Sequence, residues 1–144
     1  MPMEIVQIRR RVQVRLADIK RAAAERRDRI AAAERAYEAF LAGVAAPTIT
    51  AVAQSLSAEG YPYRVTTPGR AVRMSSDRSS RTYLEIRLDT SGPEPQLVAE
   101  IGRERGSRVL ADERPVCAGM AIEAVTDEHL LAAVLEAMAE LIER

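Results

Sequence analysis

The chain has 144 residues, of which 47% are hydrophobic and 29% charged, a composition typical of one folded domain with an appended element. Its 21 basic and 21 acidic residues balance, which argues against a protein that coats nucleic acid. The single cysteine, Cys117, excludes an intramolecular disulfide and a cysteine-based zinc site.

Charge is distributed unevenly along the chain. Residues 1–45 carry ten basic and six acidic side chains, whereas residues 46–144 carry eleven basic and fifteen acidic ones. This opposite balance favours contact between the two parts, head to tail or between helix and domain, or a basic helix that binds a partner. Only Lys20 is a lysine. Because arginine and alanine codons are rich in G and C, we attribute the abundance of arginine to genome composition.

Residues 3–41 contain no Gly or Pro and are rich in good helix formers, which predicts a long amphipathic helix. Apolar side chains recur in alternating steps of three and four, the heptad pattern of coiled coils. The interface predicted from this stripe consists of Val12, Leu16, Ile19, Ala23, Arg26, Ile30, Ala33, Tyr37 and Phe40.

Such a helix of about 40 residues would be roughly 60 Å long, which a small domain cannot cover. We therefore expect the stripe to pair with a helix of a second chain and to produce a homodimer. Arg26, inside the stripe, would set the register or pair with an acid of the partner. The alternative is that the helix folds back on its own domain.

Gly43 and Pro47 are expected to end this helix. We therefore divide the chain into a partner-binding helix over residues 1–46 and an α+β domain over residues 47–144. A short second helix, with Thr48 or Thr50 as its N-cap, would open the domain.

The hydrophobic period then changes from that of a helix to two, which predicts strands separated by Gly/Pro turns. The predicted strands are residues 63–66, 72–74, 83–89 and 97–101, with 109–116 as a fifth. Thr126 is expected to cap a last amphipathic helix. Strands grouped between helices define an α+β fold with an antiparallel meander sheet. Helices on one face of the sheet would bury Val65, Val72, Leu84, Ile86, Leu97 and Ile101.

No constellation of residues indicates catalysis. Cys117 and His129 both have ordinary structural interpretations, so we do not expect a catalytic pair. A nuclease-like metal site would draw on the acids of the predicted sheet, which are Asp77, Glu85, Asp89 and Glu100. Arg87 stands where such a site needs lysine, and arginine stays protonated. We interpret these acids as cross-strand ion pairs and predict no catalytic residue, metal or cofactor.

Nucleic-acid binding is the alternative function. Residues 64–87 hold six arginines against two acids, and Arg70, Arg78 and Arg81 are expected in turns at one end of the sheet. With Arg73 they form the predicted phosphate-contacting set. The few aromatic residues and the zero net charge count against this function.

We find no 18-residue apolar run and no signal peptide, so we expect no membrane span and a cytoplasmic protein. The primary hypothesis is a non-enzymatic, dimeric adaptor, chaperone-like protein or assembly subunit that binds a protein partner. A nucleic-acid-binding accessory protein is second, and it would use the arginine-rich hairpins together with a basic patch on the long helix at Arg9, Arg10, Arg11 and Arg15. A metal-dependent nuclease-like enzyme is third.

Overall fold

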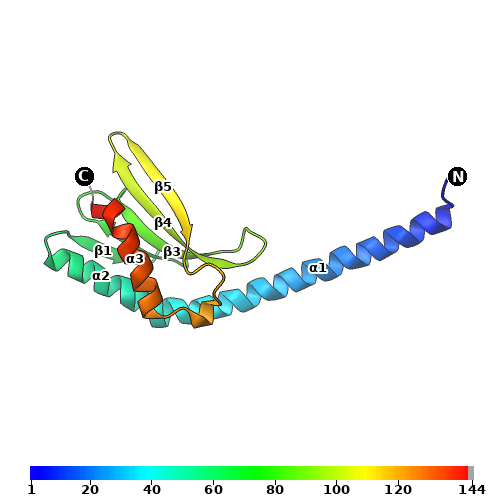
Figure 1. Cartoon of the computed structure of the whole chain (residues 1–144), viewed down its shortest axis with the longest axis horizontal. Coiled ribbons are helices and arrows are strands. Elements are labelled where there is room, and N and C mark those ends of the chain that lie inside the picture. Colours follow the sequence, from blue (N-terminus) through cyan, green and yellow to red (C-terminus); the bar gives the residue numbers. More distant parts are fainter. Residues whose placement is uncertain (143–144) are drawn as a thin grey trace.

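The computed structural model describes residues 1–142. A long N-terminal helix is followed by a five-stranded antiparallel sheet and a C-terminal helix (Figure 1), which confirms the predicted α+β fold. The elements are α1 (Ile5–Phe40), η1 (Leu41–Ala45), α2 (Ala46–Ala58), β1 (Tyr63–Thr66), β2 (Val72–Ser76), β3 (Tyr83–Asp89), β4 (Gln96–Arg105), β5 (Arg108–Pro115), η2 (Ile122–Ala124) and α3 (Asp127–Ile142).

The predicted end of the first helix at Gly43 and Pro47 is wrong. The segment η1 is one turn of π-helix, in which the N–H of Ala46 donates to the carbonyl oxygen of Leu41, five residues earlier. Pro47 then lies in the first turn of α2, where the fixed φ of proline suits a helix and its missing N–H is tolerated. The backbone therefore stays helical from Ile5 to Ala58, and α2 has no side-chain cap from a threonine.

This continuity also corrects the expectation about apolar runs. The helix Ile5–Ala58 contains an 18-residue window that, by length and composition alone, is apolar enough to cross a membrane. Of that window, 33% is buried inside the fold, and a core helix of a globular domain meets the same criterion. Length and composition are therefore weak evidence for membrane insertion.

The sheet is a simple meander with strand order β1-β2-β3-β4-β5. Helices α2 and α3 cover one of its faces (Figure 1), and the core lies between them and the sheet. Five of the six positions expected to be buried are buried, namely Val72, Leu84, Ile86, Leu97 and Ile101, and Val65 is partly buried. The strand pattern therefore predicted the helix-covered face correctly.

The N-terminus of α3 is capped as expected. The N–H of His129 donates to Thr126 Oγ1 at 3.3 Å, and the N–H of Thr126 donates to His129 Nδ1 at 3.1 Å. This reciprocal pair satisfies two backbone donors in the manner of a capping box, with histidine in the place of the usual acid or amide.

The hairpin of β4 and β5 extends beyond the helices that cover the rest of the sheet (Figure 1). Its turn contains Gly106, whose φ of 59° lies in the left-handed region that favours glycine. On β5, Val109 and Leu110 are 43% and 41% exposed. Because β5 is the last strand in the order, its outer edge has no paired strand in the described chain.

Candidate association surface on the projecting helix

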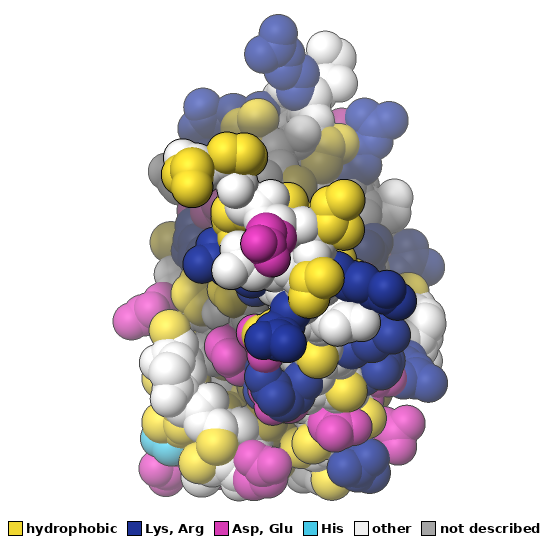
Figure 2. Space-filling model, turned by 90° about the vertical axis from the view of Figure 1, so that its right-hand side faces the viewer, with side chains coloured by type: hydrophobic (Ala, Val, Ile, Leu, Met, Phe, Trp, Pro, Cys, Tyr) yellow, Lys and Arg dark blue, Asp and Glu magenta, His cyan; other side chains and the backbone are white. Residues whose placement is uncertain are grey.

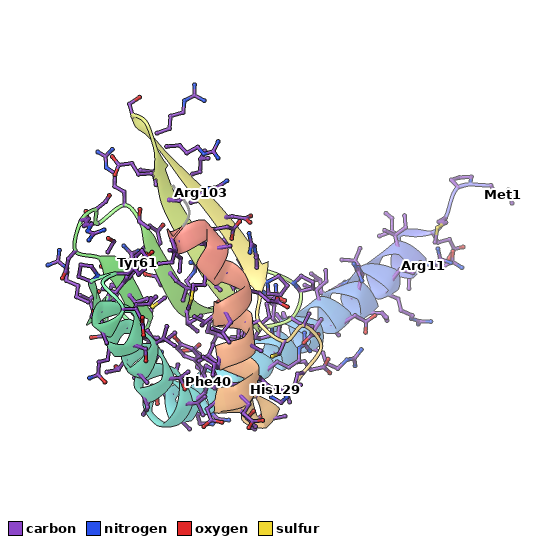
Figure 3. All side chains as sticks on the ribbon, turned by 60° about the vertical axis from the view of Figure 1, so that its left-hand side comes forward. Met1, Arg11, Phe40, Tyr61, Arg103 and His129 are labelled. Carbon is purple, nitrogen blue, oxygen red and sulfur yellow. The ribbon has the colours of Figure 1, made fainter. Side chains whose placement is uncertain are left out.

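The first turns of α1 stand clear of the domain (Figure 1). In Figure 3, Met1 and Arg11 lie on this projecting part, whereas Phe40 lies where the helix joins the packed part of the molecule. Within residues 1–142, the hydrogen bonds and ion pairs that join α1 to other elements begin at Arg26. The domain therefore holds the helix from Arg26 onward.

Arg26 anchors the helix to the turn between β3 and β4. Its guanidinium donates to the carbonyl oxygens of Thr90 at 2.9 Å and Gly92 at 3.0 Å. One turn later, Arg29 lies 3.7 Å from the carboxylate of Glu94 in the same turn. Charge-assisted bonds to backbone carbonyls hold their partners firmly, so this turn fixes the direction in which α1 leaves the domain.

Large apolar side chains on the projecting part are exposed. Their exposed fractions are 82% for Ile5, 47% for Ile8, 51% for Val12, 49% for Leu16 and 48% for Ile19. With about 100° between successive helical residues, these five lie along one side of the helix, and we call them the free stripe. A contiguous apolar surface of this kind is a candidate interaction site in a folded protein.

The structure divides the predicted interface into two parts. Val12, Leu16, Ile19 and Ala23 are exposed. Arg26, Ile30 and Ala33 are partly buried, and Tyr37 and Phe40 are 2% and 4% exposed, in the core of their own chain.

The fold-back interpretation of the heptad pattern therefore applies to the second half of the helix, whereas pairing of the first half with another chain stays a prediction. The second half folds back on its own domain, and the first half lacks a covering element in the described chain. Arg26 is bonded within its own chain, which differs from the role of setting a register with a partner. Sequence reasoning left Ile8 out, although its spacing of three from Ile5 and four from Val12 places it on the same face.

The free stripe is bordered by positive charge. Residues 5–21 contain six basic side chains and one acid, Asp18, which pairs with Arg21. Figure 2, seen from the side toward which α1 projects, shows basic and hydrophobic side chains exposed together on this part of the molecule. The projecting segment is thus a basic amphipathic helix, a form typical of partner-binding helices.

The arginines predicted to contact nucleic acid do not form one surface. Arg70 lies in the turn before β2, whereas Arg78 and Arg81 lie in the turn after β2, at the opposite end of that strand. The expectation that they cluster at one end of the sheet is therefore wrong, because antiparallel hairpins alternate their turns between the two ends.

Three of these four guanidinium groups also have partners within the chain. Arg70 pairs with Glu34 at 2.9 Å and Arg73 with Glu85 at 2.9 Å, and Arg78 donates to the carbonyl oxygen of Gly60 at 3.3 Å. Arg73 also lies over the ring of Tyr83, 4.1 Å from its centroid. Arg81 is exposed. These contacts reduce the positive charge that is available to phosphate groups.

The face of the sheet opposite the helices carries a network of ion pairs. Arg87 lies 3.5 Å from Glu85 and 3.3 Å from Glu100, and it also pairs with Glu113. The Tyr83 hydroxyl donates to Glu100. These residues come from β3, β4 and β5, so the interpretation as cross-strand ion pairs is confirmed for Glu85 and Glu100.

The two remaining acids of the nuclease hypothesis have local partners. Asp77 lies 3.2 Å from Arg64, and Asp89 accepts hydrogen bonds from the hydroxyl and the N–H of Ser91, which lower the pKa of its carboxyl group. Within residues 1–142, no group of three or more His, Cys, Asp or Glu side chains is placed to hold a metal ion.

Cys117 and His129 occupy separate structural positions. The His129 ring accepts the Thr126 N–H in the helix cap, and Cys117 follows β5 with a φ of 53° and packs against the core. No hydrogen bond between them occurs among the described residues. Their geometry therefore supplies no nucleophile and base.

Comparisons with protein-family models, with curated proteins and with solved structures each return no significant match. The class that the fold and site define is a small α+β domain carrying a projecting, basic amphipathic helix.

Proposed function

We propose that the chain is a non-enzymatic homodimer that acts as an adaptor or assembly subunit for a protein partner. The observation that carries this proposal is the exposure of the free stripe on a helix held rigidly by its own domain. Full burial of a large aliphatic side chain stabilises by about 1.5–3 kcal/mol, and a side chain that is already half covered contributes about half of that, before the cost of association. Five such residues on one face form an apolar surface that association would remove from water.

The rigidity of the projecting helix supports the same function. A segment anchored by Arg26 and continuous with a packed helix loses little conformational entropy when it binds. Recognition of a protein partner would then use the opposite end of the molecule. The β5 edge, with Val109 and Leu110 exposed, suits an added strand, since its outer main-chain groups are available for pairing.

The test is the solution mass of a variant with Leu16→Asp and Ile19→Asp together. Both side chains are about half exposed in a single chain, so the domain is expected to fold normally while the association is lost. Val14→Asp is the matched control, because Val14 is 58% exposed on another side of the same helix. A double variant with the mass of the wild-type dimer would refute the proposed use of the free stripe.

A further inference from the structure

A groove lies between α2 and α3, on the side of these helices away from the sheet. Its volume is about 670 Å³. Val52 and Leu56 of α2 and Met138 of α3 line its apolar part. On α3, Leu131 and Leu135 also line it and are 39% and 54% exposed. We call this the acceptor groove.

The acceptor groove carries charge opposite to that of the free stripe. Glu59 lines it on α2, and Asp127 and Glu128 line it at the start of α3. Among the described residues that line the groove, none is basic. The segment that carries the free stripe has six basic side chains and one acid. An apolar stripe bordered by bases is therefore complementary to an apolar groove bordered by acids.

The dimensions agree as well. From Ile5 to Ile19 the free stripe is roughly 22 Å long, and α2 is roughly 20 Å long at the standard helical rise. A helix laid between α2 and α3 would pack its ridge of side chains against two neighbours, as in a small helical bundle.

The stripe cannot reach the groove of its own chain. Both lie on the same continuous 54-residue helix, Ile5–Ala58, so the stripe and α2 follow one another along one axis. Folding back would require this helix to break near the segment that Arg26 and Tyr37 hold against the domain. The stripe that fits the groove must therefore come from another chain.

We propose that the free stripe of one copy docks in the acceptor groove of a second copy, and that the second stripe docks reciprocally in the first groove. Such an exchange is a two-fold, antiparallel arrangement of the long helices. A two-fold axis that pairs Val12 of the stripe with Ala51 of the groove crosses the long helices near residues 31–32, midway between them along the chain. This inference rests on the proposed homodimer and names its contact surfaces.

The experiment uses three full-length proteins: the wild type, a stripe variant (Leu16→Asp with Ile19→Asp) and a groove variant (Leu135→Asp). Leu135 is more than half exposed, so its substitution leaves the fold intact, which circular dichroism and thermal melting verify. We expect each variant alone to have half the wild-type mass. An equal mixture of the two should recover heterodimers, because each mixed pair keeps one intact stripe and one intact groove.

A disulfide trap gives a second readout. In a Cys117→Ser background, chains with Val12→Cys mixed with chains with Ala51→Cys should form the mixed disulfide under oxidation. The groove assignment would be overturned if the groove variant stayed fully dimeric and Val12→Cys chains formed a disulfide with one another. These two results would show that the stripes pair directly, and the proposed homodimer would still stand. A wild type that is monomeric throughout would instead overturn the proposed function itself.

Discussion

Arg26 of the long helix donates to the carbonyl oxygen of Gly92, 66 residues further along the chain, at 3.0 Å. This contact marks the point where α1 leaves its domain. On the C-terminal side of Arg26, the heptad stripe packs into the core of its own chain. On the N-terminal side, the same stripe is exposed. The transition from internal packing to the exposed free stripe thus falls at the one charged residue of the predicted stripe.

Arg26→Ala should lower the free energy of unfolding by about 1–3 kcal/mol, since hydrogen bonds from a charged group to the carbonyls of Thr90 and Gly92 are lost. Denaturant unfolding measures this change. Arg27→Ala, on the exposed side of the same turn, is the control and should have little effect. Equal stability of the two variants would show that the β3–β4 turn does not anchor the helix.

Arg87→Ala should destabilise the sheet by about 2 kcal/mol at neutral pH, because it leaves the carboxylates of Glu85, Glu100 and Glu113 facing one another without their shared cation. The loss should shrink as the salt concentration is raised, because dissolved ions screen the repulsion between these carboxylates. Arg64→Ala is the control, since its pair with Asp77 is exposed to solvent and contributes little. A deficit independent of salt concentration would contradict an electrostatic role for Arg87.

Gly102→Ala should displace the ring of Tyr83. A Cβ atom at position 102 would lie 2.2 Å from Tyr83 Cε1, and the ring would have to leave both Arg73 and Glu100. We expect a cost of about 1–3 kcal/mol in thermal or denaturant unfolding. In a Tyr83→Ala background the same substitution should cost far less. If the two effects simply add, the ring is not the reason that position 102 is glycine.

Stability should fall as the pH rises from 10 to about 12. Burial, together with the charge of Glu85, raises the pKa of Tyr37 from 10.0 to about 12. Burial and the hydrogen bond to Glu100 raise the pKa of Tyr83 to about 12 as well. In this window the unfolded chain loses tyrosine protons before the folded chain does, so proton loss favours unfolding, whereas below pH 10 the stabilisation is complete.

Absorbance of tyrosinate as a function of pH, in native protein and in denaturant, measures this difference. The native titration should be displaced to higher pH. Tyr37→Phe should reduce this displacement, because it removes one of the two tyrosines with a raised pKa. Superimposable native and denatured titrations would contradict the burial of these two hydroxyl groups.

The sequence predicts much of the fold because its patterns are local. Alternation of apolar residues identified the helix-covered side of the strands, as at Leu84 and Ile86, and Thr126 was recognisable as a cap. The continuation of the first helix past Pro47 could not be predicted. It depends on the π turn Leu41–Ala45, which has no local sequence signal of its own.

The candidate surface was predicted in part. A heptad pattern indicates that a stripe is covered, but the pattern is the same whether the cover is the chain's own domain, as at Phe40, or another molecule. The acceptor groove was missed because its two walls, around Val52 and Leu135, are far apart in the sequence. The excess width of the apolar face of α3, which leaves Leu131 and Leu135 exposed, was the one signal available.

Sedimentation equilibrium of the wild-type protein over a wide range of concentrations measures whether the free stripe is covered by a second chain in solution. We expect a species of twice the chain mass of 15.8 kDa, which the Leu16→Asp and Ile19→Asp substitutions convert to 15.8 kDa. A wild-type mass of 15.8 kDa at every concentration would contradict the proposed homodimer.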